Sequence, residues 1–127
     1  MEDALRTRLK ADPAVAAIVG AGVYWDERPQ ATAYPAVVLE TIFGQRDQHL
    51  KGFDGFHSTR VQVNCFSTTK KEAVSLREAV IAAIVPAAAE GGTEFLRAQD
   101  IEVRQGPKST STGTTHNEIV EATIWHD

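Results

Sequence analysis

The sequence predicts an α+β protein, a two-layer sandwich with a mainly antiparallel sheet of about four to five strands and helices packed on one face. Segments with a period of two, typical of strands, alternate with segments in which apolar residues recur every three or four positions, typical of helices. The strands are joined mainly by loops, which permits antiparallel pairing. At 127 residues, the chain is expected to form a single domain over residues 1–127.

Two short helices are predicted near the start of the sequence. From about Glu2 to Lys10 the apolar residues fall on one helical face. Asp12 then supplies an N-cap, and Pro13 fits the first position of a second helix, PAVAAIV. Gly20 is expected to end this helix, and the VYW that follows at 23–25 is a short strand or an extended edge.

Two longer strands are predicted in the middle of the sequence. Ala36–Phe43 is rich in β-branched and aromatic residues, and Pro35 fits its entrance. From Arg60 to Phe66, apolar and polar residues alternate, which is typical of a strand with one buried face. GQRDQHLKGFDGFH, between these strands, is expected to be a long connecting loop or a hairpin tip.

A third helix and two further strands complete the prediction. Ser67–Thr69 offers capping residues for a helix with regularly spaced apolar residues, which ends near Pro86. AAAEGGTEF is then predicted to form turns that return the chain from this helix to the sheet. Asp100–Gln105 reads as a short, half-buried strand, and a polar Ser/Thr-rich loop follows it. Glu118–Trp125 alternates apolar and polar residues and closes the sheet.

Composition excludes several classes of protein. The net charge is -4 and the 13 basic residues are scattered, which argues against strong nucleic-acid binding. A single cysteine excludes an intramolecular disulfide and makes a cysteine-based zinc site improbable. The apolar run AVIAAIVPAAA is too short to span a bilayer, and no secretion signal is readable. We therefore expect a soluble protein made in the cytoplasm, without a membrane partner.

No catalytic, metal-binding or cofactor-binding residues are predicted, and no cofactor. Cys65 falls on the inward side of its strand, where a free cysteine behaves as a small buried apolar residue. The histidines are expected in loops or at chain ends, without the spacing of a metal site; they are His49, His57, His116 and His126. The alternative is a small intracellular enzyme that uses Cys65 with His57 or His116.

Three surfaces are candidates for contact with other proteins. The outward sheet face is polar, and is either simply solvated or a subunit interface. The loop from Gly44 to Phe56 exposes apolar residues, and the loop from Gly106 to Asn117 is nearly uncharged; each is a binding element or a disordered tip. The candidate contact residues are Arg60, Gln62, Asn64, Glu102 and Arg104 on the sheet, with Leu50, Phe53, Phe56, Lys108 and His116 in the loops.

The sequence resembles the tail completion or tail terminator proteins of long-tailed phages, which also occur in prophages and in gene-transfer particles. The matching features are LRTRLKADPAVAAIVGAGVYW, then YPAVVLE, then RVQVNCFSTTKKEAVSLREAVIAAI, and a final strand that ends in IWHD. The passage from RVQVNCF into the helix is the most specific. Asn64 and Phe66 stand where many relatives are expected to have Asp and Trp.

The resemblance implies a structural virion protein, not an enzyme. It would form a homo-oligomeric ring, a hexamer, at the head-proximal end of the tail tube. There it would end polymerisation of the major tail tube protein and offer the surface to which the head connector or stopper protein docks. DNA would pass through the ring without sequence-specific binding. The alternative within the same virion is another neck protein of the head-tail interface, a stopper or an adaptor.

Overall fold

The computed structural model describes residues 2–20, 22–25, 35–46, 57–90, 92–106 and 115–126. Three helices and seven strands are found in these segments. The elements, in chain order, are α1 Glu2–Ala11, α2 Pro13–Val19, β1 Val23–Trp25, β2 Ala36–Arg46, β3 His57–Ser67, α3 Lys70–Ile84, β4 Ala88–Glu90, β5 Thr93–Phe95, β6 Gln99–Gln105 and β7 His116–His126.

The helix starts lie where the sequence predicts them. The Asp12 carboxylate accepts hydrogen bonds from the backbone N–H groups of Ala14 and Val15, at 3.0 and 3.1 Å, and Pro13 is the first residue of α2. Thr69 caps α3, because its hydroxyl accepts a hydrogen bond from the Glu72 backbone N–H at 3.2 Å. Capping side chains thus satisfy backbone donors that the first turns of α2 and α3 leave without a partner in the helix.

The sheet has more strands than predicted. Its order is β1-β2-β3-β7-β5-β4, and β6 also pairs with β7. The expectation of four to five strands was wrong because AAAEGGTEF, predicted to be a turn-rich return, forms two three-residue strands, β4 and β5. Such short strands carry too few residues for a readable alternation. The predicted antiparallel character is confirmed for every pair except β1 with β2, which is parallel.

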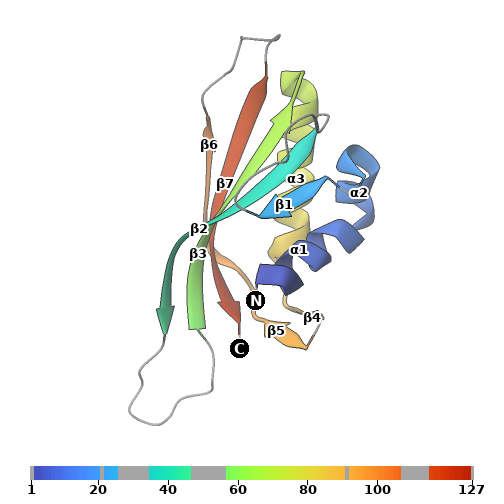
Figure 1. Cartoon of the computed structure of the whole chain (residues 1–127). Helices are drawn as coiled ribbons and strands as arrows, with labels where there is room; N and C mark the ends of the chain where they lie inside the picture. Colours follow the sequence, from blue (N-terminus) through green and yellow to red (C-terminus); the bar gives the residue numbers. More distant parts are fainter. Residues whose placement is uncertain are drawn as a thin grey trace.

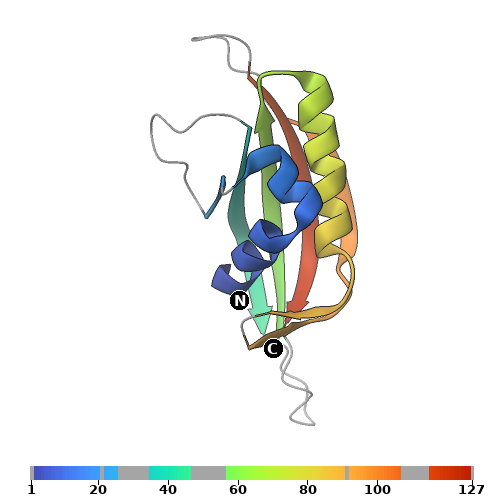
Figure 2. The ribbon, with the colours of Figure 1, turned by 90° about the vertical axis from the view of Figure 1, so that its right-hand side faces the viewer.

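The three helices lie on one side of the sheet, as Figures 1 and 2 show. The core lies between them, built on β3 from Val61, Val63 and Cys65, which are at most 1% exposed. Leu76 and Val80 of α3 pack into the same cluster. The inward row that the alternation of β3 predicts is therefore confirmed, and it positions the polar residues of this strand on the opposite face.

Strands β2 and β3 form a long hairpin. They pair from Ala36 opposite Phe66 to Arg46 opposite His57, with an irregularity between Thr41 and Phe43. Both strands run further than the sequence indicates, and their far ends extend beyond the helices in Figure 1. The final strand, expected over Glu118–Trp125, also begins earlier and runs from His116 to His126.

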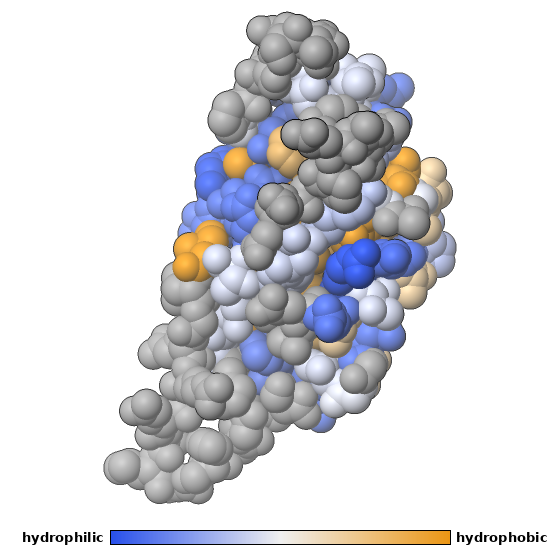
Figure 3. All heavy atoms as spheres, viewed as in Figure 1, coloured by the Kyte–Doolittle hydropathy of each residue, from blue (hydrophilic) through white to orange (hydrophobic). Residues whose placement is uncertain are grey.

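None of the helices in the described segments is long and apolar enough to cross a membrane. On the face seen in Figure 3, hydrophobic residues form small, separate areas among hydrophilic ones. Among the described residues the exposed large apolar side chains are Ile42, Leu96 and Val103. Isolated apolar residues of this kind are normal on a protein surface.

Candidate functional site

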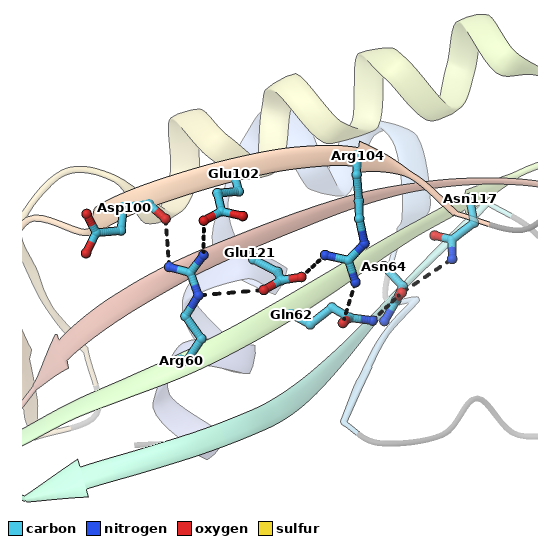
Figure 4. A network of polar contacts seen from close by, with 8 residues as sticks. All are labelled: Arg60, Gln62, Asn64, Asp100, Glu102, Arg104, Asn117 and Glu121. Carbon is cyan, nitrogen blue, oxygen red and sulfur yellow. Dashed lines mark hydrogen bonds and ion pairs between the residues drawn. The ribbon is translucent and has the colours of Figure 1, made fainter.

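The polar residues of β3 and β6 predicted to share a sheet face do lie together. Strand β7 runs between β3 and β6, and its Glu121 pairs in register with Gln62 on one side and with Glu102 on the other. Figure 4 shows the resulting network on the face away from the helices. We call this set the open-face network; it consists of Arg60, Gln62, Asn64, Asp100, Glu102, Arg104, Asn117 and Glu121.

Arg60 is the most enclosed cation of the open-face network. Its Nη1 donates to the backbone oxygen of Asp100 at 2.6 Å and to the hydroxyl of Thr123 at 3.1 Å. Its guanidinium also lies 3.3 Å from Glu102 Oε1 and 3.7 Å from Glu121 Oε1. These contacts tie β6 to β3 across β7. They also hold the irregular start of β6, where Asp100 adopts a φ of 52° that is costly for a residue with a side chain.

A second chain of contacts continues the network along β3. Arg104 forms an ion pair with Glu121, and its Nη2 donates to Gln62 Oε1 at 3.1 Å. Gln62 Nε2 in turn donates to Asn64 Oδ1 at 3.0 Å, and Asn117 Nδ2 donates to the same oxygen at 3.3 Å. The Asn64 amide is further held by the Val38 backbone oxygen, at 3.2 Å.

The structure corrects the expectation that all these residues are surface-exposed. The Arg60 side chain is only 10% exposed and Asn64 is 4% exposed. Arg60 is covered because the start of β6 lies beside it, and Asn64 because Asn117 and β2 enclose it. Strand β6 shows the opposite deviation. It was predicted to be half-buried, but Val103 is 46% exposed, and only Ile101 among its residues is partly covered.

The open-face network combines two arginines, Arg60 and Arg104, with three acidic residues, Asp100, Glu102 and Glu121, so it carries one more negative than positive charge. A shallow depression beside it is lined by Arg60, Asp100, Ile101, Glu102, Glu121 and Thr123. Within the described segments no group of three His, Cys, Asp or Glu residues could hold a metal ion. The polar groups of the network mainly satisfy one another, and the charged side chains that it presents to a partner surface are those of Glu102 and Arg104, which are 71% and 50% exposed.

The predicted loop residues are only partly placed. Leu50, Phe53, Phe56 and Lys108 lie outside the described residues, as does His49. His116 was expected in a loop, but it lies in β7 opposite Ser67 of β3, and its Nδ1 is buried without a hydrogen-bond partner. His57 and His126 were likewise expected in a loop and at a chain end, but they pair with each other as residues of β3 and β7.

Cys65 is buried, as predicted. It is fully enclosed on the inner face of β3, and burial raises the pKa of its thiol to about 12. The thiolate is the reactive form of cysteine, so such a thiol is a poor nucleophile near neutral pH. The structure thus offers no support for the alternative of an enzyme that acts through Cys65.

A buried ion pair beneath the helices was not anticipated from the sequence. Glu118 of β7 is 4% exposed at its side chain, and its Oε1 accepts a hydrogen bond from Arg77 Nη1 of α3 at 2.7 Å. The sequence did indicate that Glu118 is buried, because it lies two and four residues before the inward residues Val120 and Ala122, and alternate residues of a strand point to the same face. Arg77 lies on the helix side that faces the sheet, where its long side chain reaches the carboxylate.

Comparisons with known proteins agree with the resemblance seen in the sequence. The family model of tail completion protein gp17 matches residues 3–121. No curated protein matches the sequence.

Solved structures share the fold. A chain in the virion of a native gene transfer agent particle is 19% identical, with a TM-score of 0.64; the match covers 100% of this chain and 95% of that one. A second solved chain, 14% identical, has a TM-score of 0.60, and its match covers 100% of this chain and 96% of that one. At these identities, the structural matches establish the fold, and the family match establishes the relationship. The chain therefore belongs to the tail completion protein gp17 family, a family of structural tail proteins and not of enzymes.

Proposed function

We propose that this structural tail protein forms a hexameric ring at the head-proximal end of the tail tube. The ring ends polymerisation of the major tail tube protein and joins the tail to the head connector or stopper protein. The observation that carries the proposal is the match of residues 3–121 to a tail completion family. The fold shared with a chain of a gene transfer agent virion supports a place in a particle of this kind.

The shape of the domain supports assembly into a ring. A closed ring of identical subunits needs two different surfaces on each subunit, which meet head to tail. The two sides of this sheet differ in this way, since helices cover one and the other carries the open-face network. We place the subunit contacts at the open-face network, where Glu102 and Arg104 are exposed and Arg60, Gln62 and Asn64 hold them in place. Residues 47–56 and 107–114 are further candidates for contact with the tube, the connector or the next subunit.

The charge of the subunit supports a channel through which DNA passes without being bound. The net charge of the chain is -4. A wall that is not basic does not retain phosphate groups. A ring with a strongly basic lumen would contradict this part of the proposal.

The proposal is tested by deleting the gene from the phage or particle that carries it. We expect tail tubes of abnormal length that do not join to heads, and restoration of normal particles when the gene is supplied in trans. Tails of normal length that still join to heads would overturn the proposal. Tails of normal length that fail to join would instead indicate a stopper or adaptor, located beside the portal.

The contact residues are tested separately with a charge reversal at Arg104, Arg104→Glu. This residue is half-exposed, so its replacement should leave folding nearly intact while weakening ring assembly. Arg97→Glu, at another exposed arginine outside the proposed contact, serves as the matched control. Equal assembly of both variants would argue against a subunit contact at Arg104.

A further inference from the structure

Strand β6 has an open edge. It pairs on one side with β7, and no strand in the described part of the chain pairs with its other side. Every residue of β6 except Ile101 is exposed. In Figure 1, β6 lies at the margin of the sheet, beyond β7. An unpaired strand edge of this kind presents backbone donors and acceptors to whatever strand approaches it.

The ladder between β6 and β7 shows which backbone groups face outward. The Gly106 N–H donates to the Asn117 oxygen at 2.7 Å, so this pair is a hydrogen-bonded one. Hydrogen-bonded pairs recur at every second residue of an antiparallel ladder, so the backbone groups of Arg104 and Glu102 also face β7. The N–H and C=O groups of Val103 and Gln105 therefore face away from the sheet.

The opposite margin of the sheet is closed in a way that β6 is not. Arg6 of α1 donates from its Nε to the backbone oxygen of Val23 in β1, at 2.8 Å. Val23 is also fully buried, whereas Val103 is 46% exposed. The protein thus caps one edge of its sheet with its own side chain. In β6, Arg60 donates to the backbone oxygen of Asp100 near the start of the strand, but among the described residues no side chain bonds the outward backbone groups of Val103 or Gln105.

We propose that the β6 edge binds the same edge of a second copy of this chain, in an antiparallel two-fold pair centred on Val103. In this register, Val103 of each copy forms two backbone hydrogen bonds with Val103 of the other. Glu102 of each copy then lies opposite Arg104 of the other, at a Cα separation of about 4.5 Å that brings side chains together. The sequence Glu-Val-Arg is thus complementary to itself when it is reversed.

The charged side chains in this contact reach solvent. Glu102 is 71% exposed and Arg104 is 50% exposed, although each already has an ion-pair partner within the chain. Both point to the open face, so they meet on one side of the joined sheets. The two Val103 side chains meet on the other side, and part of the exposed apolar surface of each is removed from water.

A two-fold contact does not close a head-to-tail ring, so the pair describes the free chain before assembly. It does not depend on the proposed function. It does use Glu102 and Arg104, which are proposed to face the neighbour in a ring, so pairing and ring assembly would compete for this strand. Pairing would keep the edge of β6 covered until subunit contacts formed in the ring at the tail tube replace it.

Charge variants test the register. We would measure the molar mass of the full chain by sedimentation equilibrium for the unchanged protein, for Glu102→Arg, for Arg104→Glu, and for an equimolar mixture of the two variants. The unchanged chain should form dimers, and each variant alone should dimerise about tenfold more weakly, because like charges then face each other. The mixture should recover dimers, since the two basic side chains of the Glu102→Arg copy would face the two acidic side chains of the Arg104→Glu copy.

A backbone variant tests the edge itself. Val103→Pro removes an N–H that faces away from β7, so the ladder within the chain stays intact while the central intermolecular bonds are lost. Val103→Thr keeps the N–H and is the matched control. Dimerisation should be lost in the proline variant and kept in the threonine variant, with both folded by circular dichroism.

The proposal is overturned by an unchanged chain that stays monomeric at several hundred micromolar, or that forms a ring without a dimer. It is also overturned if the two charge variants dimerise as well alone as when mixed. A mutant phage with normal tails would argue against the proposed function but leave this pairing intact, so failure of the two proposals can be told apart.

Discussion

Arginine and glutamate meet on both faces of the sheet, and the two places differ in how far water reaches them. Under the helices, Arg77 Nη1 lies 2.7 Å from Glu118 Oε1, and the glutamate side chain is 4% exposed. On the open face, Glu102 is 71% exposed and Arg104 is 50% exposed. The same chemistry therefore has two uses: the buried pair fixes α3 on β7, and the exposed charges remain available to a partner.

The difference has an energetic reason. Removing one member of a buried pair leaves a charge without a partner in a medium that solvates it poorly, which is strongly destabilising. Exposed pairs contribute little, because water and salt screen them. Arg60 stands between these cases, since it belongs to the open-face network but its side chain is 10% exposed.

Breaking the buried pair should have the largest effect. Arg77→Met leaves Glu118 buried without its partner, and should lower the free energy of unfolding by about 3–5 kcal/mol. Denaturation in urea, followed by circular dichroism, measures this loss. The double variant Arg77→Met with Glu118→Leu should recover much of it, because no charge then stays buried. A single variant as stable as the unchanged chain would show that the pair does not anchor α3.

Removing Arg60 should have an intermediate effect. Arg60→Ala loses two hydrogen bonds from a charged group and the ties to β6, and should cost about 1–3 kcal/mol of unfolding free energy. Hydrogen exchange should become faster at 99–102 and stay unchanged in α3. Arg97→Ala, at an exposed arginine, is the control. Equal acceleration throughout the chain would mean that Arg60 supports the whole domain and not β6 in particular.

The reactivity of Cys65 should report opening of the helix side. Because burial raises the pKa of its thiol to about 12, the folded chain should react slowly with iodoacetamide at pH 8 and rapidly in denaturant. The thiol ionises more readily in the unfolded chain, at its ordinary pKa, so stability should also fall as the pH rises from 9 towards 12. Fast labelling of the native chain would contradict the burial of Cys65.

Truncating Arg104 should have the smallest effect on folding. Arg104→Ala removes a half-exposed side chain, and should change the free energy of unfolding by at most about 1 kcal/mol. Urea denaturation of Arg104→Ala and Arg60→Ala under the same conditions compares the unfolding free energies lost at the two arginines of the open-face network. A loss as large as that of Arg60→Ala would mean that exposure does not separate the two arginines.

The sequence was sufficient to predict the longer elements and the inward row of β3. Regular alternation and capping residues such as Asp12 and Thr69 are local signals, and the structure follows them. The strands β4 and β5 were missed because three residues are too few to show a period, and their pairing depends on distant partners. The burial of Arg60 was missed because it depends on β6, which lies far away in the sequence.

The site was predictable in composition but not in its contacts. Alternation placed Arg60, Gln62 and Asn64 on one face, but only the register with β7 brings Glu121 between them and β6. Glu118 shows the reverse case. Alternation along β7 places Glu118 on the inward face, but a charged residue is rarely buried without a partner. Its partner, Arg77, comes from α3, and the sequence of β7 alone does not indicate it.

Cryo-electron microscopy of the head-tail junction, in the particle that contains this chain, would show directly whether the ring forms. We predict a hexameric ring of the chain at the end of the tail tube, in which Glu102 and Arg104 contact a neighbouring subunit and the Arg77–Glu118 pair stays inside each subunit. Absence of the chain from the end of the tube, or a ring in which the open-face network touches only solvent, would contradict it.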